Sequence, residues 1–290
     1  MRKKQTFAIF KALQEALTEK CFLEKTACKR KDILYLLEKE SWTAGIDAIL
    51  QEEISCEAVV LLCSDAMDTL ADKRPKKGWL LHIYNWILKR LFDGREDISL
   101  NEGTNAAVMF YLQVLRVFLQ WEKENLPYER TRDFHFATAE EIRESPYLEQ
   151  YICFLQSFRM DYVQELMRIG REIMPFDTLA HVAGVHHVAM HIGRQLKKVG
   201  VPVDLGLISG AAAGHDIGKY GCRDMEMKRI PYLHYYYTDQ WFRRHGLFEI
   251  GTIAANHSTW DLELENLPVE SLILIYADFR VKKQGYQNGK

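Results

Sequence analysis

The apolar residues of this chain recur at helical spacing from its first turns onward. A helix is expected over residues 3–22. Its apolar stripe consists of Phe7, Phe10, Leu13 and Leu17. Asp32 is expected to cap a second helix, and residues 42–71 to contain a third and a fourth. Within that range Cys56–Cys63 is apolar enough for a buried strand, but no partner strand is evident, so a helix is expected there too.

Two polar stretches interrupt this pattern in the first half of the chain. The first, Lys73–Gly78, is basic and contains a proline, which is typical of a solvated loop. Helices are expected after it over Trp79–Phe92 and Asn105–Lys123. The second stretch, Pro127–Ala137, is charged and lacks a helical period, so it is the candidate domain boundary. We therefore expect a helical N-terminal domain over residues 1–135, to which the sequence assigns no role.

Helical patterns return in the second half, which is expected to form a domain over residues 136–290. Thr138 and Glu141 have the spacing of a capping box for a short helix. Residues 146–174 are then expected to form one long helix, a candidate link between the two domains. Because no segment pairs convincingly as strands, the predicted fold class is all-α.

The later helices have recognisable beginnings. Asp177 or Thr178 is expected to cap one helix, and Asp204 the next. Residues 231–246 are expected to begin as an aromatic loop and to become helical further on. The last helix is expected to begin near Pro268.

Composition describes a globular protein and excludes several classes. The 290 residues are 48% hydrophobic and 27% charged, with a net charge of −2, which leaves no footprint for a dedicated nucleic-acid binder. No segment reaches the roughly 18 uninterrupted apolar residues of a membrane span. Six cysteines without a C-x-x-C pair fit reduced thiols. We expect a cytoplasmic protein with no membrane partner, and the sequence assigns it no oligomeric state.

The candidate chemistry is concentrated between His181 and His257, where eight of the ten histidines lie. In Ala211–Lys219 a small-residue helix leads into the adjacent pair His215 and Asp216. Neighbouring residues on a helix diverge by about 100°, so this pair cannot serve one tetrahedral ion from one face. It suits a larger site, in which one residue offers an imidazole nitrogen and the other a carboxylate that bridges two ions.

Further candidate ligands precede and follow this pair. His181 begins an amphipathic helix and lies on its apolar face. His245 and His257 come later, and Asp278 follows the apolar run Leu272–Ala277. A buried aspartate on such a helix is costly unless it is paired, and a metal ion would satisfy it.

The order His, His-Asp, His, His, Asp resembles the HD-domain metal-dependent phosphohydrolases, an all-helical superfamily defined by His…His-Asp…Asp. The resemblance implies an HD-type helical bundle, preceded here by the helical N-terminal domain. It covers roughly residues 175–280 and leaves the first half unaccounted for. The four defining ligands that it implies are His181, His215, Asp216 and Asp278.

A narrower resemblance is to the HD-GYP branch, which hydrolyses cyclic dinucleotides at a centre of two or three metals. It rests on His-Asp-Ile-Gly-Lys-Tyr-Gly from His215, on Arg-His-Gly around His245, and on His-Ser-Thr-Trp-Asp from His257. The chain departs from that branch at Asn256, where the branch has the first of two adjacent histidines, and the Gly-Tyr-Pro after Asp261 is missing. The resemblance therefore supports a binuclear site better than it supports a cyclic dinucleotide as substrate.

These observations predict a phosphohydrolase or phosphodiesterase that acts on a nucleotide or a related small phosphate ester. Asp216 is expected to bridge two divalent ions, and Lys219 to bind the substrate phosphate. Ligands of nitrogen and oxygen without thiolate suit Mn, Fe, Co, Ni or Zn. The remaining ligands are expected to be His181, His215 and Asp278 on one ion, and His245 and His257 on the other.

Several alternatives stay open. The chain could instead be a metal-binding regulatory module that senses a nucleotide without turnover, or a di-iron oxygenase on the same fold. Lys219 could be an ordinary helix-end lysine, and His234 stands evenly between ligand and ordinary histidine. His186 is expected to have no metal role, and His187 and His191 to lie on the surface. The aromatic residues between 232 and 241, together with Trp260, are either core or the wall of a base-binding pocket.

Overall fold

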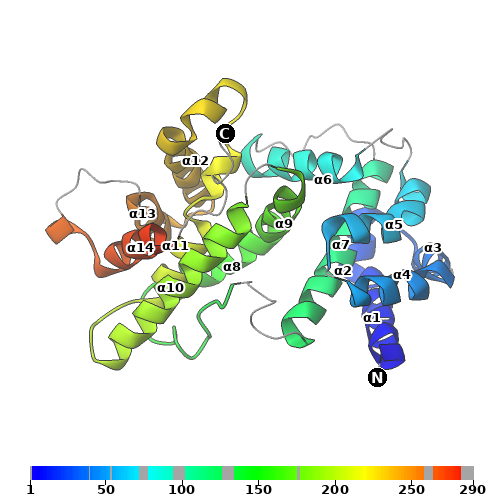
Figure 1. Cartoon of the computed structure of the whole chain (residues 1–290), viewed down its shortest axis with the longest axis horizontal. Helices are drawn as coiled ribbons and strands as arrows, with labels where there is room; N and C mark the ends of the chain where they lie inside the picture. Colours follow the sequence, from blue (N-terminus) through cyan, green and yellow to red (C-terminus); the bar gives the residue numbers. More distant parts are fainter. Residues whose placement is uncertain are drawn as a thin grey trace. The chain divides into compact units, whose positions relative to one another are not determined.

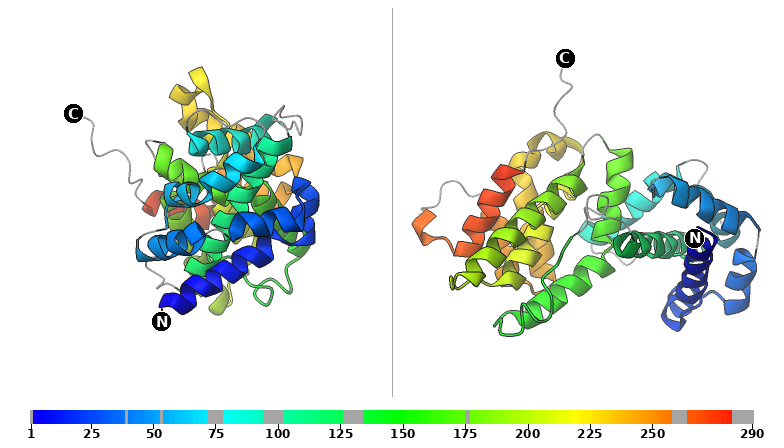
Figure 2. Two further views of the ribbon diagram at one scale, coloured as in Figure 1. Left: turned by 90° about the vertical axis from the view of Figure 1, so that its right-hand side faces the viewer. Right: turned by 60° about the horizontal axis from the view of Figure 1, so that its bottom comes forward.

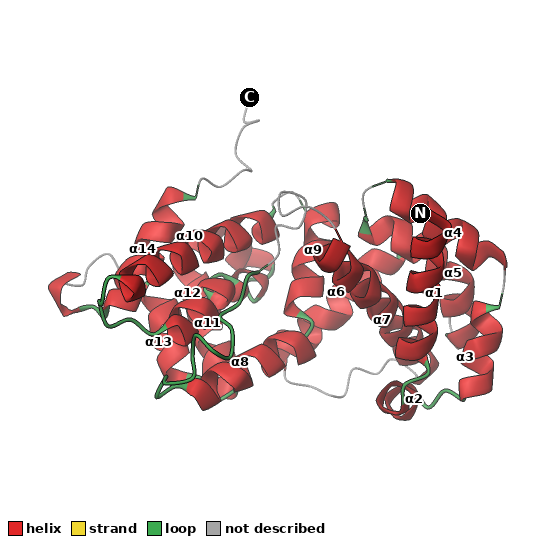
Figure 3. Ribbon diagram, turned by 90° about the horizontal axis from the view of Figure 1, so that it is seen from below, coloured by secondary structure: helices red, strands yellow, loops and turns green. Residues whose placement is uncertain are grey.

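The computed structural model is all-α, and every regular element in the part of the chain that it describes is a helix (Figure 1, Figure 3). It describes residues 2–38, 40–52, 54–71, 78–93, 102–125, 134–174, 177–257 and 264–281. The predicted fold class is confirmed. Among these residues, no helix combines the length and the apolar character needed to cross a bilayer. The polar stretches expected as a loop (Lys73–Gly78) and as a domain boundary (Pro127–Ala137) lie mostly outside the described residues, which omit 72–77 and 126–133.

The chain divides into two compact units. Unit 1 comprises Met1–Trp86 and Glu96–Thr131, and unit 2 comprises Ile87–Arg95 and Arg132–Lys290. Unit 2 therefore takes in a short segment from within residues 1–135, which the sequence had suggested as a continuous N-terminal domain.

Unit 1 is built around its longest helix, α7, which packs against α1, α2 and α5. Leu13 and Leu17 of the stripe expected on the first helix are completely buried here, as are Val59 and Phe110, whereas Phe7 of that stripe is exposed. The helix expected over residues 3–22 is interrupted after Leu17, and a separate helix begins at Lys20. In chain order the helices are α1 (Arg2–Leu17), α2 (Lys20–Thr26), α3 (Arg30–Leu37), α4 (Glu40–Gln51), α5 (Cys56–Leu70), α6 (Trp79–Leu88) and α7 (Glu102–Asn125).

Unit 2 holds the remaining helices. The last residues of α6 belong to it, and a π-helical segment follows them directly. In chain order its elements are η1 (Lys89–Asp93), α8 (Leu148–Met160), α9 (Val163–Ile173), α10 (Thr178–Lys198), α11 (Leu205–Gly214), η2 (Ile217–Tyr220), η3 (Asp224–Arg229), α12 (Ile230–Arg244), α13 (Phe248–Asn256), η4 (Leu264–Asn266) and α14 (Val269–Arg280).

The centre of unit 2 is α11, in which every residue is buried. It packs against α8, α10, α13 and α14, and α14 also lies beside α10 (Figure 2). Small residues make this crowding feasible, because a Cβ atom at Gly214 would lie 2.6 Å from the ring of Phe242. Asp204 caps the helix by accepting a hydrogen bond from the Leu207 amide, as expected. The small-residue helix thus delivers its last residues into the middle of the unit.

Three expectations for unit 2 were wrong in detail. Residues 146–174 form two helices, α8 and α9, which separate at Tyr162, where the backbone is left-handed (φ 60°). Both helices belong to unit 2, so they do not link two domains. Thr138 and Glu141 make the reciprocal capping-box hydrogen bonds, but a turn follows instead of a helix. α12 is helical from Ile230, with Pro231 in its first turn, where a proline needs no amide hydrogen bond.

A buried polar network joins three parts of unit 2 at Ser209 of α11. Its hydroxyl contacts His186 Nε2 at 3.0 Å, Tyr151 Oη at 3.0 Å and the Ala137 amide at 3.2 Å. His186 is completely buried beside the rings of Phe134 and Phe136, and its Nδ1 atom has no hydrogen-bond partner. A proton added to this ring would place a charge and an unsatisfied donor in an apolar environment. Burial accordingly lowers the pKa of His186 to about 3.

This depressed pKa makes the stability of unit 2 depend on pH. The unfolded chain binds a proton at His186 near pH 6.5, and the folded chain does so only near pH 3. Its contribution is therefore fully present above about pH 6.5 and is lost as the pH falls towards 3, with a slope of up to about 1.4 kcal/mol per pH unit. We expect His186→Gln to flatten the dependence of unfolding free energy on pH over this range, as measured by urea denaturation.

The matched control is His187→Gln, which changes an exposed histidine on the same helix. It should leave the slope unchanged. Equal slopes for wild type and His186→Gln would contradict a neutral, buried His186.

Candidate metal centre

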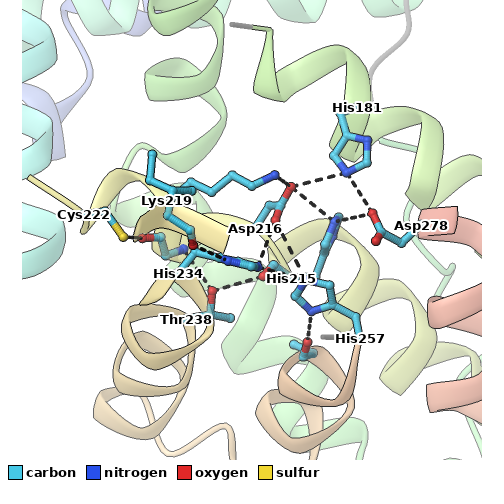
Figure 4. Close-up of polar contacts among 12 residues, drawn as sticks. His181, His215, Asp216, Lys219, Cys222, His234, Thr238, His257 and Asp278 are labelled. Atoms are coloured by element: carbon cyan, nitrogen blue, oxygen red, sulfur yellow. Dashed lines mark hydrogen bonds and ion pairs between the residues drawn. The ribbon is translucent and has the colours of Figure 1, made fainter. Parts of the chain in front are cut away.

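The candidate centre is built around the turn that follows α11. His215 caps the end of α11 and Asp216 begins η2, so the two side chains leave the turn in different directions. Both are buried, with 0% and 2% of their surfaces exposed. Residues from α10, α12, α13 and α14 surround the Asp216 carboxylate from two sides (Figure 4).

The first side consists of residues from α10, α11 and α14. His181 Nε2 lies 3.3 Å from Asp216 Oδ2 and 2.9 Å from Asp278 Oδ1. His215 Nε2 lies 3.5 Å and 3.7 Å from the same two oxygens. The structure therefore brings together all four residues that the resemblance named. His181, His215 and Asp278 present one ligand atom each within 4.8 Å of one another, as a metal ion requires.

The second side faces the other carboxylate oxygen. His234 Nε2 of α12 lies 3.6 Å from Asp216 Oδ1, and His257 Nε2, just after α13, lies 3.9 Å from it. The two Nε2 atoms are 3.2 Å apart. Asp216 thus directs Oδ2 towards one set of imidazoles and Oδ1 towards another, which is the arrangement expected of a bridging carboxylate.

Backbone carbonyls fix the tautomers of three of these imidazoles. Nδ1 of His215, His234 and His257 lies 2.9, 2.8 and 2.5 Å from the carbonyl oxygens of Ala212, Ile230 and Ala254. A carbonyl oxygen can only accept, so Nδ1 carries the proton in the neutral ring and Nε2 presents a lone pair. Such a second contact is typical of histidines that bind metals.

Imidazole lone pairs and carboxylate oxygens therefore face one another in a buried space, with few hydrogen atoms between them. Nε2 of His181 and Nε2 of His215 make no hydrogen bond of acceptable geometry, although carboxylate oxygens lie within 4 Å of both. His234 and His257 would place two lone pairs 3.2 Å apart. Divalent ions between the two carboxylates and the imidazoles would satisfy these acceptors at once. The residues present thus fit divalent ions with nitrogen and oxygen ligands, the class that includes Mn, Fe, Co, Ni and Zn.

The charges of the site agree with this interpretation. Burial would raise the pKa of Asp216, but the neighbouring Lys219 and imidazoles hold it well below its usual range. Asp278 follows the same pattern beside His181 and His215. Burial lowers the pKa of His257 to about 3 and also lowers that of His234. The two imidazoles on the Oδ1 side are therefore neutral, as metal ligands must be. Burial would lower the pKa of His181, but the Asp216 and Asp278 carboxylates raise it.

His245 is not part of this cluster, which corrects the expectation that it pairs with His257. Its Nε2 lies 3.2 Å from Asp161 Oδ2, and its Nδ1 donates to the Trp241 carbonyl. His234, which the sequence left undecided, faces Asp216 instead. His187 and His191 are exposed, as expected. Asn256 donates to Ser271 Oγ, so it does not replace the missing histidine of the HD-GYP pattern.

Lys219 forms an ion pair with Asp216 Oδ2, and 14% of its side chain is exposed. It is therefore more than a lysine at a helix end. Without ions it neutralises the same oxygen that His181 and His215 face. Its partial exposure leaves one flank open towards solvent.

Thr238 joins the His-Asp turn to α12. Its completely buried hydroxyl donates to the His215 carbonyl and accepts from the Gly218 amide, each at 3.0 Å. The two backbones approach so closely that a Cβ atom at Gly218 would lie 1.7 Å from the His234 carbonyl oxygen. Only glycine fits this position. The contact therefore fixes His234 relative to Asp216.

The aromatic residues expected near the site divide between core and surface. Trp241 is completely buried, whereas Tyr232, Tyr235 and Tyr236 are exposed. Tyr237 donates a hydrogen bond to Glu226. Trp260 lies outside the described residues. Trp241 therefore belongs to the core, and the four tyrosines of α12 do not form a buried pocket wall.

The different environments of His234 and His245 lead to a prediction on metal binding. We expect His234→Ala to lose one of two bound ions, because it removes a ligand from the Oδ1 side of Asp216. His245→Ala should retain both, because its imidazole pairs with Asp161. Ions per chain, measured by elemental analysis after loading with Co²⁺ and desalting, test this. Loss of an ion in His245→Ala alone would contradict the assignment.

The Thr238 contact leads to a second prediction. Thr238→Val keeps the shape of the side chain but leaves the buried Gly218 amide unsatisfied, which costs about 1–3 kcal/mol of unfolding free energy. By releasing the turn it should also weaken Co²⁺ binding about 10–100-fold, as for other residues that support metal ligands. Thr238→Ser retains the hydroxyl and should bind Co²⁺ nearly as wild type does. Titration followed by visible absorption, beside urea denaturation, checks both effects, and wild-type affinity in Thr238→Val would rule out the positioning role.

The comparisons of the chain with protein-family models, with curated proteins and with solved structures give no match. The function must therefore be argued from the residues of the centre itself.

Proposed function

We propose that the chain is a metal-dependent phosphohydrolase or phosphodiesterase that acts on a nucleotide or a related small phosphate ester through a binuclear centre. The observation that carries this proposal is the buried Asp216 carboxylate between two sets of inward-facing imidazole nitrogens. Two divalent ions that share one carboxylate supply Lewis acidity and a water of lowered pKa, which is the chemistry used to hydrolyse phosphate esters.

The ligand sets follow from which oxygen of Asp216 each residue faces. His181, His215 and Asp278 lie on the Oδ2 side, and His234 and His257 on the Oδ1 side. His234 thus takes the place first expected for His245. Asp216 balances positive charge on both sides, and the carbonyl contacts of its imidazole neighbours hold their Nε2 atoms towards it.

Lys219 supports phosphate as the group acted upon. Its ammonium pairs with Asp216 Oδ2 and keeps a partly exposed flank. Once ions neutralise Asp216, the ammonium is free to pair with an anion on the same side. A phosphate oxygen carrying developing charge is such an anion. An oxygenase acting on a neutral carbon substrate has no comparable use for the lysine.

The remaining properties fit a small-molecule enzyme of the cytoplasm. All six cysteines are free thiols, as expected in a reducing compartment. The net charge of −2 provides no attraction for a nucleic-acid backbone. We therefore propose a diffusible phosphate ester as the substrate.

The test compares Asp216 and Lys219 in protein purified without a chelator. Asp216→Asn removes the shared charge, so bound metal and turnover should fall together. Lys219→Met removes a competing cation from Asp216, so the ions should bind at least as tightly. Its turnover should nevertheless fall about 10²–10³-fold, the usual loss for one charge-stabilising donor. The measurements are metal content and steady-state rates on phosphomonoesters and phosphodiesters with each of the five metals.

Lys228→Met is the matched control, because Lys228 is exposed on the neighbouring η3, and its rates should equal those of wild type. Wild-type rates in Lys219→Met would reduce the lysine to a counter-ion of Asp216. An iron pair without phosphoesterase activity would favour the di-iron oxygenase. Bound metal with neither activity would favour the nucleotide-sensing module.

A further inference from the structure

Residues 87–92 lie against the helix that carries His234, although His234 comes 142 positions after Phe92 in the chain (234 − 92). They include most of η1, a π-helix that continues α6. Its terminal carbonyl groups need partners from outside the helix. Arg223 Nη2 donates to the Leu88 carbonyl at 3.2 Å, and Arg244 Nη2 donates to the Leu91 carbonyl. Arg244 is the last residue of α12, and Arg223 immediately precedes η3, which packs against α12.

Side chains complete this contact. The ring of Phe92 meets the ring of Tyr237 edge to face, with centroids 6.0 Å apart. The Tyr237 hydroxyl donates to the Glu226 carboxylate on η3. α12 is therefore held by η1 at two points, at Tyr237 along its flank and at Arg244 in its last turn.

The position of α12 matters because it delivers His234. Its inner face is already joined to the His-Asp turn by Thr238, four residues after His234. Tyr237 lies one residue before Thr238, on the flank that faces η1. Besides Thr238, the completely buried Trp241 and Phe242 anchor α12 on its inner face. Contacts at Tyr237 and Arg244 support its other flank, and together these anchors keep His234 Nε2 near Asp216 Oδ1.

We propose that Tyr237 and Arg244 are positioning residues through which residues 87–92 set the affinity of the second cation subsite, formed by His234, His257 and Asp216 Oδ1. This inference rests on the metal centre of the proposed function but not on its reaction. Loosening the contact displaces one ligand of that subsite. The first subsite takes its ligands from α10, α11 and α14, so it should keep its affinity.

The test uses matched pairs of identical residues on α12. Arg244→Met removes the donor to Leu91, whereas Arg243→Met removes a second exposed arginine, which pairs with Asp239. Tyr237→Leu removes the ring that meets Phe92, whereas Tyr232→Leu changes an exposed tyrosine on the same helix. Co²⁺ is titrated into each chelator-treated protein, and amide hydrogen exchange of α12 is followed without metal.

Arg244→Met and Tyr237→Leu should each weaken the second Co²⁺ about tenfold while leaving the first unchanged, the lower end of the effect of supporting residues on metal affinity. They should also speed exchange of the α12 amides. Arg243→Met and Tyr232→Leu should match wild type in both measurements. Arg244→Lys, which keeps a donor, and Tyr237→Phe, which keeps the ring, should restore most of the second affinity.

Wild-type affinity for both ions in Arg244→Met and Tyr237→Leu would overturn the inference. Equal weakening of both ions would also overturn it, because that pattern means general destabilisation. If Arg244→Met does not fold, Tyr237→Leu decides alone. The proposed function fails differently: a wild type that binds two ions and hydrolyses no phosphate ester would refute the reaction and leave this inference standing.

Discussion

A buried carboxylate surrounded by acceptors is the constraint on which unit 2 depends. Asp216 is 2% exposed, and its oxygens face the Nε2 atoms of four histidines. An unpaired carboxylate in such a place costs several kcal/mol. In the neutral form, three of the four rings can donate a hydrogen bond to this carboxylate only if they give up the one to a backbone carbonyl. The site is therefore stable only with positive charge inside it, and every element that supplies a ligand is held in place by contacts outside the site.

Those outside contacts explain why the surrounding residues are so small or so specific. α11 carries the His-Asp pair through the centre of the unit, and a Cβ atom at Gly214 would collide with Phe242. Gly218 lets the turn touch the backbone of α12, and Thr238 of α12 makes two hydrogen bonds to that turn. A larger residue at Gly214 or Gly218 would push these elements away from α12. The ligands on the two sides of Asp216 would then no longer converge on its carboxylate.

Local pattern in the sequence predicted much of this arrangement. The periodicity predicted most of the helices, and the caps at Asp177 and Asp204 form as expected. The order of histidines and aspartates selected His181, His215, Asp216, His257 and Asp278. It selected His245 wrongly and left His234 undecided. These residues are eleven apart, so they lie on one face of α12, separated along its axis by about 16 Å. Which of them meets Asp216 depends on how far the helix is shifted along the turn, and contacts such as Thr238–His215 fix that shift.

Lys219 shows how such a site can exist before any ion arrives. Its ammonium pairs with Asp216 Oδ2 and offsets the charge that burial would otherwise penalise. The Oδ1 side has no comparable ammonium among the described residues; it has only the neutral rings of His234 and His257. The two sides therefore differ in what they would offer an ion. On the Oδ2 side an ion would compete with Lys219, whereas on the Oδ1 side it would meet lone pairs with no ammonium to displace. Ligand position would then be the main determinant of affinity on the Oδ1 side, and the placement of α12 would matter more there than for the ligands on α10 and α14.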